Sequence, residues 1–325
     1  MTKIQDIVLS IRKEYALRKA YLKQKIRNGN QRIRFYNWNW GDEPQIWFSA
    51  FIQNSDLGTK IKKNINFCTV FGKREVLRFV TDGVKIFFSG ENLHLLDHEA
   101  YKDGLLNDKN CNLSLGFDCK DDVRYVRFPL WLTYVFEPTM DEQKIHERCE
   151  QLRYPKMGNR DKFACLIARA DISGIRTAMY DGLEKIGKVD CPSDLFHNDE
   201  SLKQLFGDNK VEYMHQYLFN ICPENSNAKG YCTEKVFEAI AAGCIPVYWG
   251  DGNNPEPGIL NPDAIIFWDV ESHGARALQQ IQDLYSNQTK LEEFLKQPRL
   301  LPSAEKKITG ILQLFCDRIR MAAEK

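Results

Sequence analysis

The stretch YLFNICPENSNAKGYCTEKVFEAIAAGCIPVYWG, residues 217–250, constrains the fold of this chain more than any other segment. An apolar run comes first, and a polar loop, an alanine-rich helical segment and a run with β-branched residues follow it. A strand, a helix and a second strand in so short a span are typical of an open α/β sheet. The polar residues lie between the first strand and the helix, where such sheets bind ligands.

The rest of the chain repeats this alternation on both sides of a polar stretch. Before residue 137 we expect strands within RIRFYNWNW, NFCTVFG, VKIFFSG, CNLSLGF and YVRFPLWL. After residue 162 we expect strands within FACLIA, KVD, YLFNICPEN, CIPVYWG and AIIFWDV, and from about residue 272 a helical tail. The sequence therefore predicts two α/β domains, 1–150 and 151–325, with a ligand cleft between them.

Composition excludes several classes of protein. The chain is 43% hydrophobic and 27% charged, with a net charge of +1, which gives no case for nucleic-acid binding. No run is long and apolar enough to span a bilayer, and the first residues do not form a secretory signal. Ten cysteines without a Cys-x-x-Cys pair are typical of a reduced, cytoplasmic protein.

Residues 3–27 form a predicted basic amphipathic helix. The segment 1–34 has ten Lys/Arg against Asp6 and Glu14, a charge of +8, so the remainder carries −7. Apolar residues recur near helical spacing at Ile4, Ile7, Val8, Ile11, Tyr15, Leu22 and Ile26. We expect this stripe to pack on the domain behind it. The alternative is peripheral contact with an anionic membrane surface, such as the inner membrane of a bacterium.

Lys235 is the residue that points to a bound anion. Thr233 is the predicted N-cap of the helix, so Glu234 and Lys235 lie in its first turn, and Gly243 ends it. A cation at a helix N-terminus opposes the helix dipole, and a bound diphosphate would compensate for it. The alternative is that Lys235 is solvated. The strand–turn–helix context favours the phosphate.

A second cation would complete such a site. An enzyme that uses a nucleotide sugar stabilises the departing diphosphate with a metal or with fixed cations, and this chain has no Asp-x-Asp for a metal. Arg176 begins the first helix of the second α/β series and is the candidate. Its alternative is an exposed helix arginine.

Five motifs together resemble the α-1,3-fucosyltransferases of glycosyltransferase family 10, bacterial type. Residues 223–250 are similar to the family signature of Glu-Asn-Ser/Thr, Tyr-x-Thr-Glu-Lys, a Pro-Val/Ile strand and Trp-Gly. The other motifs are NWNWGDE at 37–43, FFSGEN at 87–92, LGFDCKDDVRYVRFPLW at 115–131 and GIRTAMYDGL at 174–183. Cys232 and Pro223 depart from the usual residues, and both leave the matched contact positions intact.

The resemblance implies a GT-B fold, in which two Rossmann-like domains face a central cleft. The first domain would bind the acceptor and the second GDP-fucose. By match of motif, Arg176, Asn225, Tyr231 and Lys235 would bind the phosphates and ribose of the donor. Glu234 would lie near the fucose or ribose and steady positive charge on the sugar. No metal or other cofactor is implied.

The resemblance also implies inversion at the fucose, from GDP-β-L-fucose to an α-linked product. A single displacement needs a base to take the proton of the acceptor hydroxyl. Glu91 follows an apolar strand and a glycine, which places a carboxylate at a strand end. Without the resemblance, Glu91 would be interpreted as a loop residue that binds a backbone N–H.

Acceptor contacts are predicted at Trp38 and Trp40, which could stack on a sugar, and at His94 near Glu91. The expected acceptor is an N-acetyllactosamine-type glycan, fucosylated at the 3-hydroxyl of N-acetylglucosamine. The sequence leaves three alternatives open: another nucleotide sugar, an α-1,4 linkage, or a carbohydrate- or nucleotide-binding protein without catalysis.

Overall fold

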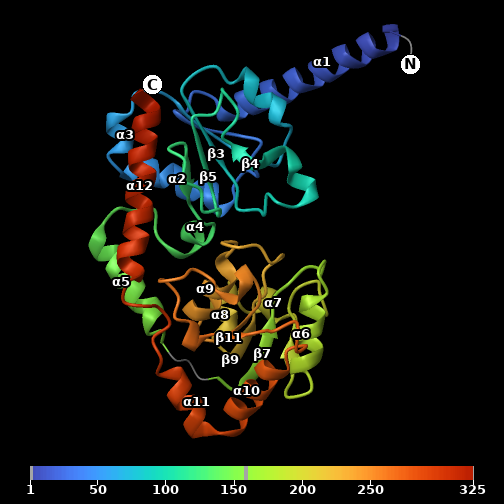
Figure 1. Ribbon diagram of the computed structural model, residues 1–325, viewed down its shortest axis with the longest axis vertical. Helices are drawn as coiled ribbons and strands as arrows, with labels where there is room; N and C mark the ends of the chain where they lie inside the picture. The colour runs from blue at the N-terminus through green and yellow to red at the C-terminus, as the bar shows by residue number, and fades with distance from the viewer. Residues whose placement is uncertain (1–2, 157–159, 325) are drawn as a thin grey trace. The chain divides into compact units, whose positions relative to one another are not determined.

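The protein consists of two compact units, each with its own five-stranded parallel sheet (Figure 1). The computed structural model describes residues 3–156 and 160–324. The first unit comprises the described residues within Met1–Thr133, Glu137–Met140 and Ile311–Lys325. The second comprises those within Tyr134–Phe136 and Asp141–Gly310. The predicted α/β class is confirmed.

The first sheet has the order β1-β2-β3-β5-β6, so its strands follow one another as they do along the chain. Its strands are β1 (Ile33–Tyr36), β2 (Ile65–Cys68), β3 (Val84–Phe88), β5 (Leu113–Gly116) and β6 (Tyr125–Arg127). Each of the five apolar runs expected before residue 137 supplies one of them. These strands are largely buried, as parallel strands covered on both faces are.

Helices, short turns and one further strand precede, connect and follow these strands. They are α1 (Lys3–Asn28), α2 (Glu43–Asn54), α3 (Leu57–Lys60), η1 (Arg74–Phe79), η2 (Leu96–Tyr101), the short strand β4 (Lys102–Leu105) and α4 (Trp131–Val135). Asp42 caps α2 by accepting the N–H of Gln45 at 3.0 Å. Phe48 on the buried face of α2 stacks on Phe67 of β2, with ring centroids 4.7 Å apart.

The second sheet has the order β11-β10-β9-β7-β8, which reverses direction between β7 and β9. Its strands are β7 (Lys162–Leu166), β8 (Val189–Asp190), β9 (Tyr217–Ile221), β10 (Ile245–Tyr248) and β11 (Ile266–Phe267). The chain lays down its second strand on one side of the first and the later strands on the other. This is the doubly wound pattern, whose ligands bind where the order reverses.

Eight helices follow α4 in the described part of the chain; the first seven lie in the second unit, and α12 is shared between the two units. They are α5 (Glu142–Arg153), α6 (Ile175–Leu183), α7 (Ser201–Gln204), α8 (Lys210–Met214), α9 (Glu234–Ala241), α10 (Ala275–Ser286), α11 (Gln288–Leu295) and α12 (Ala304–Glu324), with the turns η3 (Asp251–Asn253) and η4 (Pro262–Ala264). Gly243 follows α9 with a φ of +71°, as expected for the glycine that ends this helix. The predicted helical tail is confirmed as α10 to α12.

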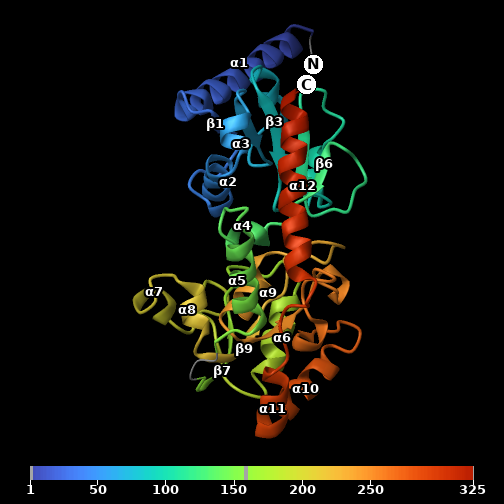
Figure 2. The same cartoon turned by 90° about the vertical axis from the view of Figure 1, so that its left-hand side faces the viewer.

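The compact units differ from the expected ranges 1–150 and 151–325 in two places. Helix α5 lies wholly in the second unit, where it contacts α9, and its buried residues are Ile145, Cys149 and Leu152. The C-terminal part of α12 belongs to the first unit (Figure 2). Phe315 causes this return, because it packs on rings of that unit. Its centroid lies 5.7, 5.6 and 5.0 Å from those of Phe48, Phe51 and Phe128.

Helix α1 packs on its unit with a different face from the one expected. Asn28 donates to the carbonyl of Phe35 at 2.9 Å and accepts its N–H at 2.8 Å, and Gln24 accepts the N–H of Asn37 at 2.6 Å. Leu17 is buried on the same face. These positions recur at helical spacing, so they form the docked face of α1.

The apolar stripe of α1 is therefore exposed, and the expectation that it packs on the domain is wrong. Exposure reaches 74% at Ile4 and 80% at Ile26. The whole stripe is exposed: Ile4, Ile7, Val8, Ile11, Tyr15, Leu22 and Ile26. The first turns of the helix project away from the sheet of their own unit (Figure 1).

The ten cysteines are all free thiols, and nine of them are buried. No helix within residues 3–156 and 160–324 is long and apolar enough to cross a membrane.

Candidate functional site

Glu224 connects the two polar halves of the stretch between β9 and α9. Its side chain is fully buried. One carboxylate oxygen accepts the N–H of Thr233 at 2.7 Å, and the other accepts the Thr233 hydroxyl at 2.6 Å and the Lys235 ammonium at 3.1 Å. Thr233 is the N-cap, as expected, but its hydroxyl binds Glu224 instead of capping the helix. The carboxylate thus holds the start of α9.

Lys235 has partners within the protein. Besides Glu224, its ammonium donates to the Thr233 hydroxyl at 2.7 Å and lies 3.7 Å from the Glu234 carboxylate. Burial alone would lower the pKa of Lys235, but Glu224 and Glu234 outweigh it and raise that pKa above its ordinary range. Lys235 is therefore charged, and its place at a helix N-terminus is explained without a ligand. Its side chain stays 23% exposed, so the ammonium can still meet an anion.

Arg176 and Asn225 are brought together as the sequence predicted. Asp171 orders the start of α6 by accepting the N–H of Gly174 at 2.9 Å and that of Thr177 at 2.8 Å. Arg176 then donates one N–H to the side-chain oxygen of Asn225 at 2.6 Å and another to the carbonyl of Ala170. The guanidinium is thereby held in one orientation at the carboxyl end of the sheet.

These cations line a small cavity of about 70 Å³ at the carboxyl ends of β7 and β9, where the strand order reverses. Of the predicted donor-binding residues, Arg176, Glu234 and Lys235 line it. Lys210 and Glu238 line it too, and the sequence analysis missed both. The arrangement combines fixed positive charge with the position at which doubly wound sheets bind nucleotides.

Glu238 lies one helical turn after Glu234 and 3.7 Å from the ammonium of Lys210. Burial raises the pKa of Glu238 from 4.5 to about 7. The same burial opposes ionisation of Glu234, but Lys235 outweighs it and lowers the pKa of Glu234. The i, i+4 spacing of the two glutamates was the sequence signal that could have found Glu238.

Tyr231, a predicted donor contact, is buried in this structure. Its side chain is 2% exposed, and it is absent from the lining of this cavity. It lies close enough to Lys235 to contribute, after Glu224 and Glu234, to the raised pKa of that lysine. Tyr231 thus supports the site from within in this structure.

Glu91 and His94 lie in the first unit, on the loop after β3. Glu91 is half-buried, and its backbone N–H donates to the Ser89 hydroxyl at 3.1 Å, so the turn after the strand is fixed. His94 is exposed, and its Nε2 lies 2.7 Å from a carboxylate oxygen of Asp118, which follows the neighbouring strand β5. Glu91 and His94 therefore share the carboxyl edge of the first sheet. Asp118 was not among the predicted site residues, although it falls within a matched motif.

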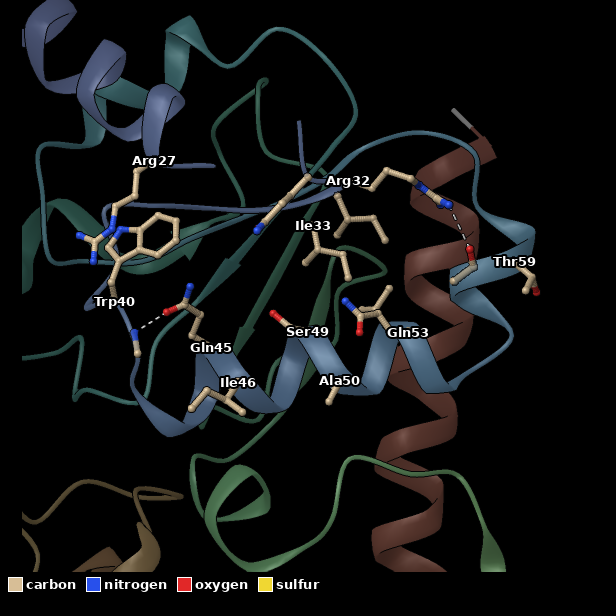
Figure 3. A pocket seen from close by; sticks show the side chains of 15 residues that line it. Arg27, Arg32, Ile33, Trp40, Gln45, Ile46, Ser49, Ala50, Gln53 and Thr59 are labelled. Carbon is tan, nitrogen blue, oxygen red and sulfur yellow. Dashed lines mark hydrogen bonds between the residues drawn. The ribbon is translucent and has the colours of Figure 1, made fainter. Parts of the chain in front are cut away.

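The two tryptophans predicted to stack on a sugar lie in different environments in the structure. Trp38 is buried, stacks on Phe88 at 5.9 Å between ring centroids and donates its indole N–H to Asp42 at 2.8 Å. It belongs to the core, so its predicted acceptor contact is not supported. Trp40 is half-exposed and lines a large cavity in the first unit (Figure 3).

Among the described residues, no group of three or more His, Cys, Asp or Glu side chains is arranged to hold a metal ion. The positively charged residues that line the cavity at the strand-order reversal are Arg176, Lys210 and Lys235.

Two family models match the chain. Residues 33–134 match the alpha-(1,3)-fucosyltransferase FucT N-terminal domain, and residues 157–323 match the glycosyltransferase family 10 (fucosyltransferase) C-terminal domain.

Two curated proteins are similar in sequence. An alpha-(1,3)-fucosyltransferase FucT of Helicobacter pylori is 28% identical over 262 residues, which cover 67% of this chain and 50% of that protein. A putative fucosyltransferase-like protein of Arabidopsis thaliana is 35% identical over 95 residues, covering 28% of this chain and 18% of that protein. The chain thus spans about half the length of the first relative and less of the second.

Three solved structures of alpha1,3-fucosyltransferase share the fold. The first has a TM-score of 0.60 at 23% identity, and the match covers 89% of both chains. One with GDP-fucose has a TM-score of 0.52 at 22% identity, covering 88% of this chain and 89% of that one. One with GDP has a TM-score of 0.55 at 20% identity, covering 93% and 95%. The expected GT-B type of fold, with two Rossmann-like units, is confirmed by these likenesses.

Proposed function

The chain belongs to glycosyltransferase family 10, the fucosyltransferases, and on that premise we propose that it is an inverting α-1,3-fucosyltransferase. It moves L-fucose from GDP-β-L-fucose to the 3-hydroxyl of N-acetylglucosamine in an N-acetyllactosamine-type glycan. The observation that carries this proposal is the set of fixed cations, Arg176 and Lys235, at the strand-order reversal of the second sheet. A structural relative holds GDP-fucose, which supports the choice of donor.

The second unit binds the donor in this proposal. Arg176 and Lys235 face the diphosphate of GDP, and Asn225 holds the Arg176 guanidinium in place for it. The departing GDP gains negative charge as its bond to fucose breaks, and fixed cations stabilise that charge. Glu234 steadies the positive charge that develops on the fucose ring. The chain's own cations thus do the work that a metal ion does in other glycosyltransferases, and no metal is needed.

The first unit supplies the base in this proposal. Glu91 accepts the proton of the acceptor hydroxyl while the oxygen forms its bond to the anomeric carbon of fucose. The bond from that carbon to GDP breaks on the opposite face, and its electron pair leaves with GDP. One bond forms and one breaks, so the β-linked donor gives an α-linked product. His94, which follows Glu91 on the same loop, would contact the acceptor.

The test is the mass of the product after incubation with GDP-fucose and N-acetyllactosamine in excess EDTA. The expected product carries one added fucose, and the position of the linkage is then determined by fragmentation. Acceptors with galactose linked β-1,4 and β-1,3 to N-acetylglucosamine separate α-1,3 from α-1,4 transfer, and a panel of nucleotide sugars tests the donor. Absence of product, with EDTA or with added manganese, together with absence of thermal stabilisation by GDP, would overturn the proposal.

We also propose that α1 holds this enzyme at the cytoplasmic face of a membrane. The exposed stripe of α1 supports this, as does the charge of the helix, where eight Lys/Arg stand against Asp6 and Glu14. A helix with an apolar stripe and a net positive charge binds anionic lipid surfaces. The free thiols support a reducing compartment.

Sedimentation with vesicles tests the membrane proposal. Phosphatidylserine-containing vesicles should carry the protein down, and vesicles of phosphatidylcholine alone should carry much less. Ile11→Glu should weaken binding at least about tenfold, because an apolar contact is replaced by a charge of the wrong sign. Leu9→Glu is the matched control, since Leu9 is exposed off the stripe. Equal losses in both variants would contradict a role for the stripe.

A further inference from the structure

The largest cavity described in the first unit has no ligand assigned above, although Trp40, a predicted acceptor contact, lines it. It has a volume of about 1020 Å³ and lies between the edge strand β1 and helix α2 (Figure 3). Trp40 and Arg27 stand at one end, and Arg32 and Thr59 stand at the other. The cavity is of the size that small-molecule sites have, and it is open to solvent along the edge of the sheet.

The charged side chains that line this cavity are all positive. Among the described residues that line it, Arg27 and Arg32 are positive, and none is Asp or Glu. Neither arginine forms an ion pair with a carboxylate in the described part of the chain. Arg32 donates to the carbonyl of Gly58 at 3.2 Å and to that of Ile61, which fixes its guanidinium at the rim. An anionic group is the ligand that such a lining attracts.

Trp40 provides an aromatic wall beside one of these charges. The Arg27 guanidinium lies over the indole ring, with 4.3 Å from its central carbon to the ring centroid. This cation–π contact holds the guanidinium in place without neutralising it. The guanidinium covers one face of the indole, so this end of the cavity offers a positive charge for a carboxylate and the uncovered part of the ring for the sugar that bears it.

Helix α2 contributes neutral hydrogen-bonding groups along the length of the cavity. Gln45, Ser49 and Gln53 recur every four residues, so they share one face of the helix and point toward β1 (Figure 3). Gln45 accepts the N–H of Gly41 at 2.5 Å, which directs its amide nitrogen away from that bond. The opposite face of α2 is anchored in the core by buried residues such as Phe48. The polar groups are thus presented by a rigid element.

The position of the cavity relates it to the acceptor. Trp40 comes shortly after the carboxyl end of β1, and Glu91 after that of β3, with β2 between these two strands. Neighbouring strands are about 4.8 Å apart, so β1 and β3 are separated by about 10 Å. A glycan of a few residues spans such a distance.

We infer that this cavity binds an acidic oligosaccharide, and that it holds the part of the acceptor glycan remote from the reacting hydroxyl. The Arg27–Trp40 pair contacts a ring that bears a carboxylate, and the α2 amides bind hydroxyls along the chain. The link to the acceptor rests on the proposed function. The binding itself does not, since it requires neither the donor nor turnover.

Calorimetric titration of the full chain tests this inference. The probe is a tetrasaccharide of alternating glucuronic acid and N-acetylglucosamine, and its neutral counterpart has every carboxyl group methyl-esterified. The acid form should bind, and the ester should bind at least about tenfold more weakly, because a charge-assisted hydrogen bond is lost. Equal affinity for the two forms would overturn the assignment of an acidic ligand.

Two variants localise the binding. Arg27→Gln should weaken the acid form about tenfold and leave the ester unchanged. Arg12→Gln removes an exposed arginine of the same helix outside the cavity and should change nothing. Equal losses in both variants would show that the charge of α1, and not the cavity, attracts the probe, and the inference would fail.

Two further outcomes separate the possible errors. An acidic peptide that binds as tightly as the tetrasaccharide, and loses affinity in Arg27→Gln, would assign the cavity to a polypeptide instead. Binding of the tetrasaccharide by a chain that transfers no fucose would support the cavity and refute the proposed function. Fucose transfer without tetrasaccharide binding would support the proposed function and refute the assignment of the cavity.

Discussion

The two parallel sheets of this protein differ in strand order, and their candidate sites differ with it. In the second sheet the order reverses between β7 and β9, and Arg176 and Lys235 gather at that reversal. In the first sheet the order follows the chain without a reversal, and the large cavity lies beside the edge strand β1 instead. A reversal leaves a crevice between the loops that depart in opposite directions. The first sheet has no such reversal, and its large cavity lies at an edge strand.

The two units also differ in what holds their site residues. In the second unit a buried charge network, centred on Glu224, orders the start of α9. In the first unit an aromatic cluster anchors α2, with Phe48 stacked on Phe67. Removing one partner from a buried charge network lowers the free energy of unfolding strongly, because the remaining buried charge is left uncompensated. The comparison therefore predicts different responses to substitution.

Glu91→Gln tests whether the base belongs to the first sheet. We expect fucose transfer to fall by about 10²- to 10⁴-fold, because the acceptor hydroxyl loses its proton acceptor. The dissociation constant of GDP should not change, since the proposed donor site lies in the second unit. Glu99→Gln, at an exposed glutamate of the first unit, is the control. Full transfer activity in Glu91→Gln would contradict the division of roles between the sheets.

Glu224→Ala tests the charge network of the second unit. The free energy of unfolding should fall by about 3 to 5 kcal/mol, because Lys235 and the Thr233 N–H lose a buried partner. Glu224→Gln keeps the shape and one acceptor, so it should cost less. Urea denaturation measures both variants. A loss below about 1 kcal/mol in Glu224→Ala would place Glu224 among ordinary surface pairs.

Glu238→Gln tests how the free energy of unfolding depends on pH through the second unit. Burial raises the pKa of Glu238 to about 7 in the folded state, so the folded protein binds this proton more tightly than the unfolded chain. Its contribution to stability is then complete below pH 4.5 and is lost as pH rises toward 7. The variant cannot ionise, and at pH 8 it should be more stable than the wild type by up to about 3 kcal/mol.

Unfolding in urea at pH 5 and pH 8 measures this difference. Glu212→Gln, at an exposed glutamate of α8, should show the same pH dependence as the wild type. If the wild type loses no more stability than Glu238→Gln between pH 5 and pH 8, the raised pKa of Glu238 is contradicted.

Arg176→Lys has the smallest expected effect. The lysine keeps the charge but cannot bind Asn225 and Ala170 together, so the cation is no longer held in place. We expect the KM for GDP-fucose to rise about tenfold, with a smaller change in kcat. Arg169→Lys, at an exposed arginine before the helix, is the control. An unchanged KM would remove Arg176 from the donor site.

Local patterns predicted most of the elements, because strands and helices are set by apolar periodicity over a few residues. Every expected strand formed, and the family resemblance placed Arg176 and Asn225 in one site, where the structure pairs them. Helix α8 was missed, since its five residues are too few for a periodicity to show. Lys210 was missed for the same reason, because it is the first residue of that helix.

The errors concern contacts that periodicity does not describe. Helix α1 docks partly through Gln24 and Asn28, whose hydrogen bonds to the β1 segment are polar, so the apolar stripe pointed to the wrong face. Glu224 found its partners nine and eleven residues away across a loop. Trp38 was predicted to contact the acceptor, although its ring belongs to an aromatic core.

The return of α12 to the first unit has a consequence for biosynthesis. Phe315 fills the core beside Phe48 and Phe128, but a ribosome adds it after every residue of the second unit. Domains usually fold in the order in which they emerge. Here the second unit can fold first, because the first unit lacks Phe315 in its core until the end of synthesis. A nascent chain stalled before Phe315 should therefore protect the later half from protease and leave the earlier half open to cleavage.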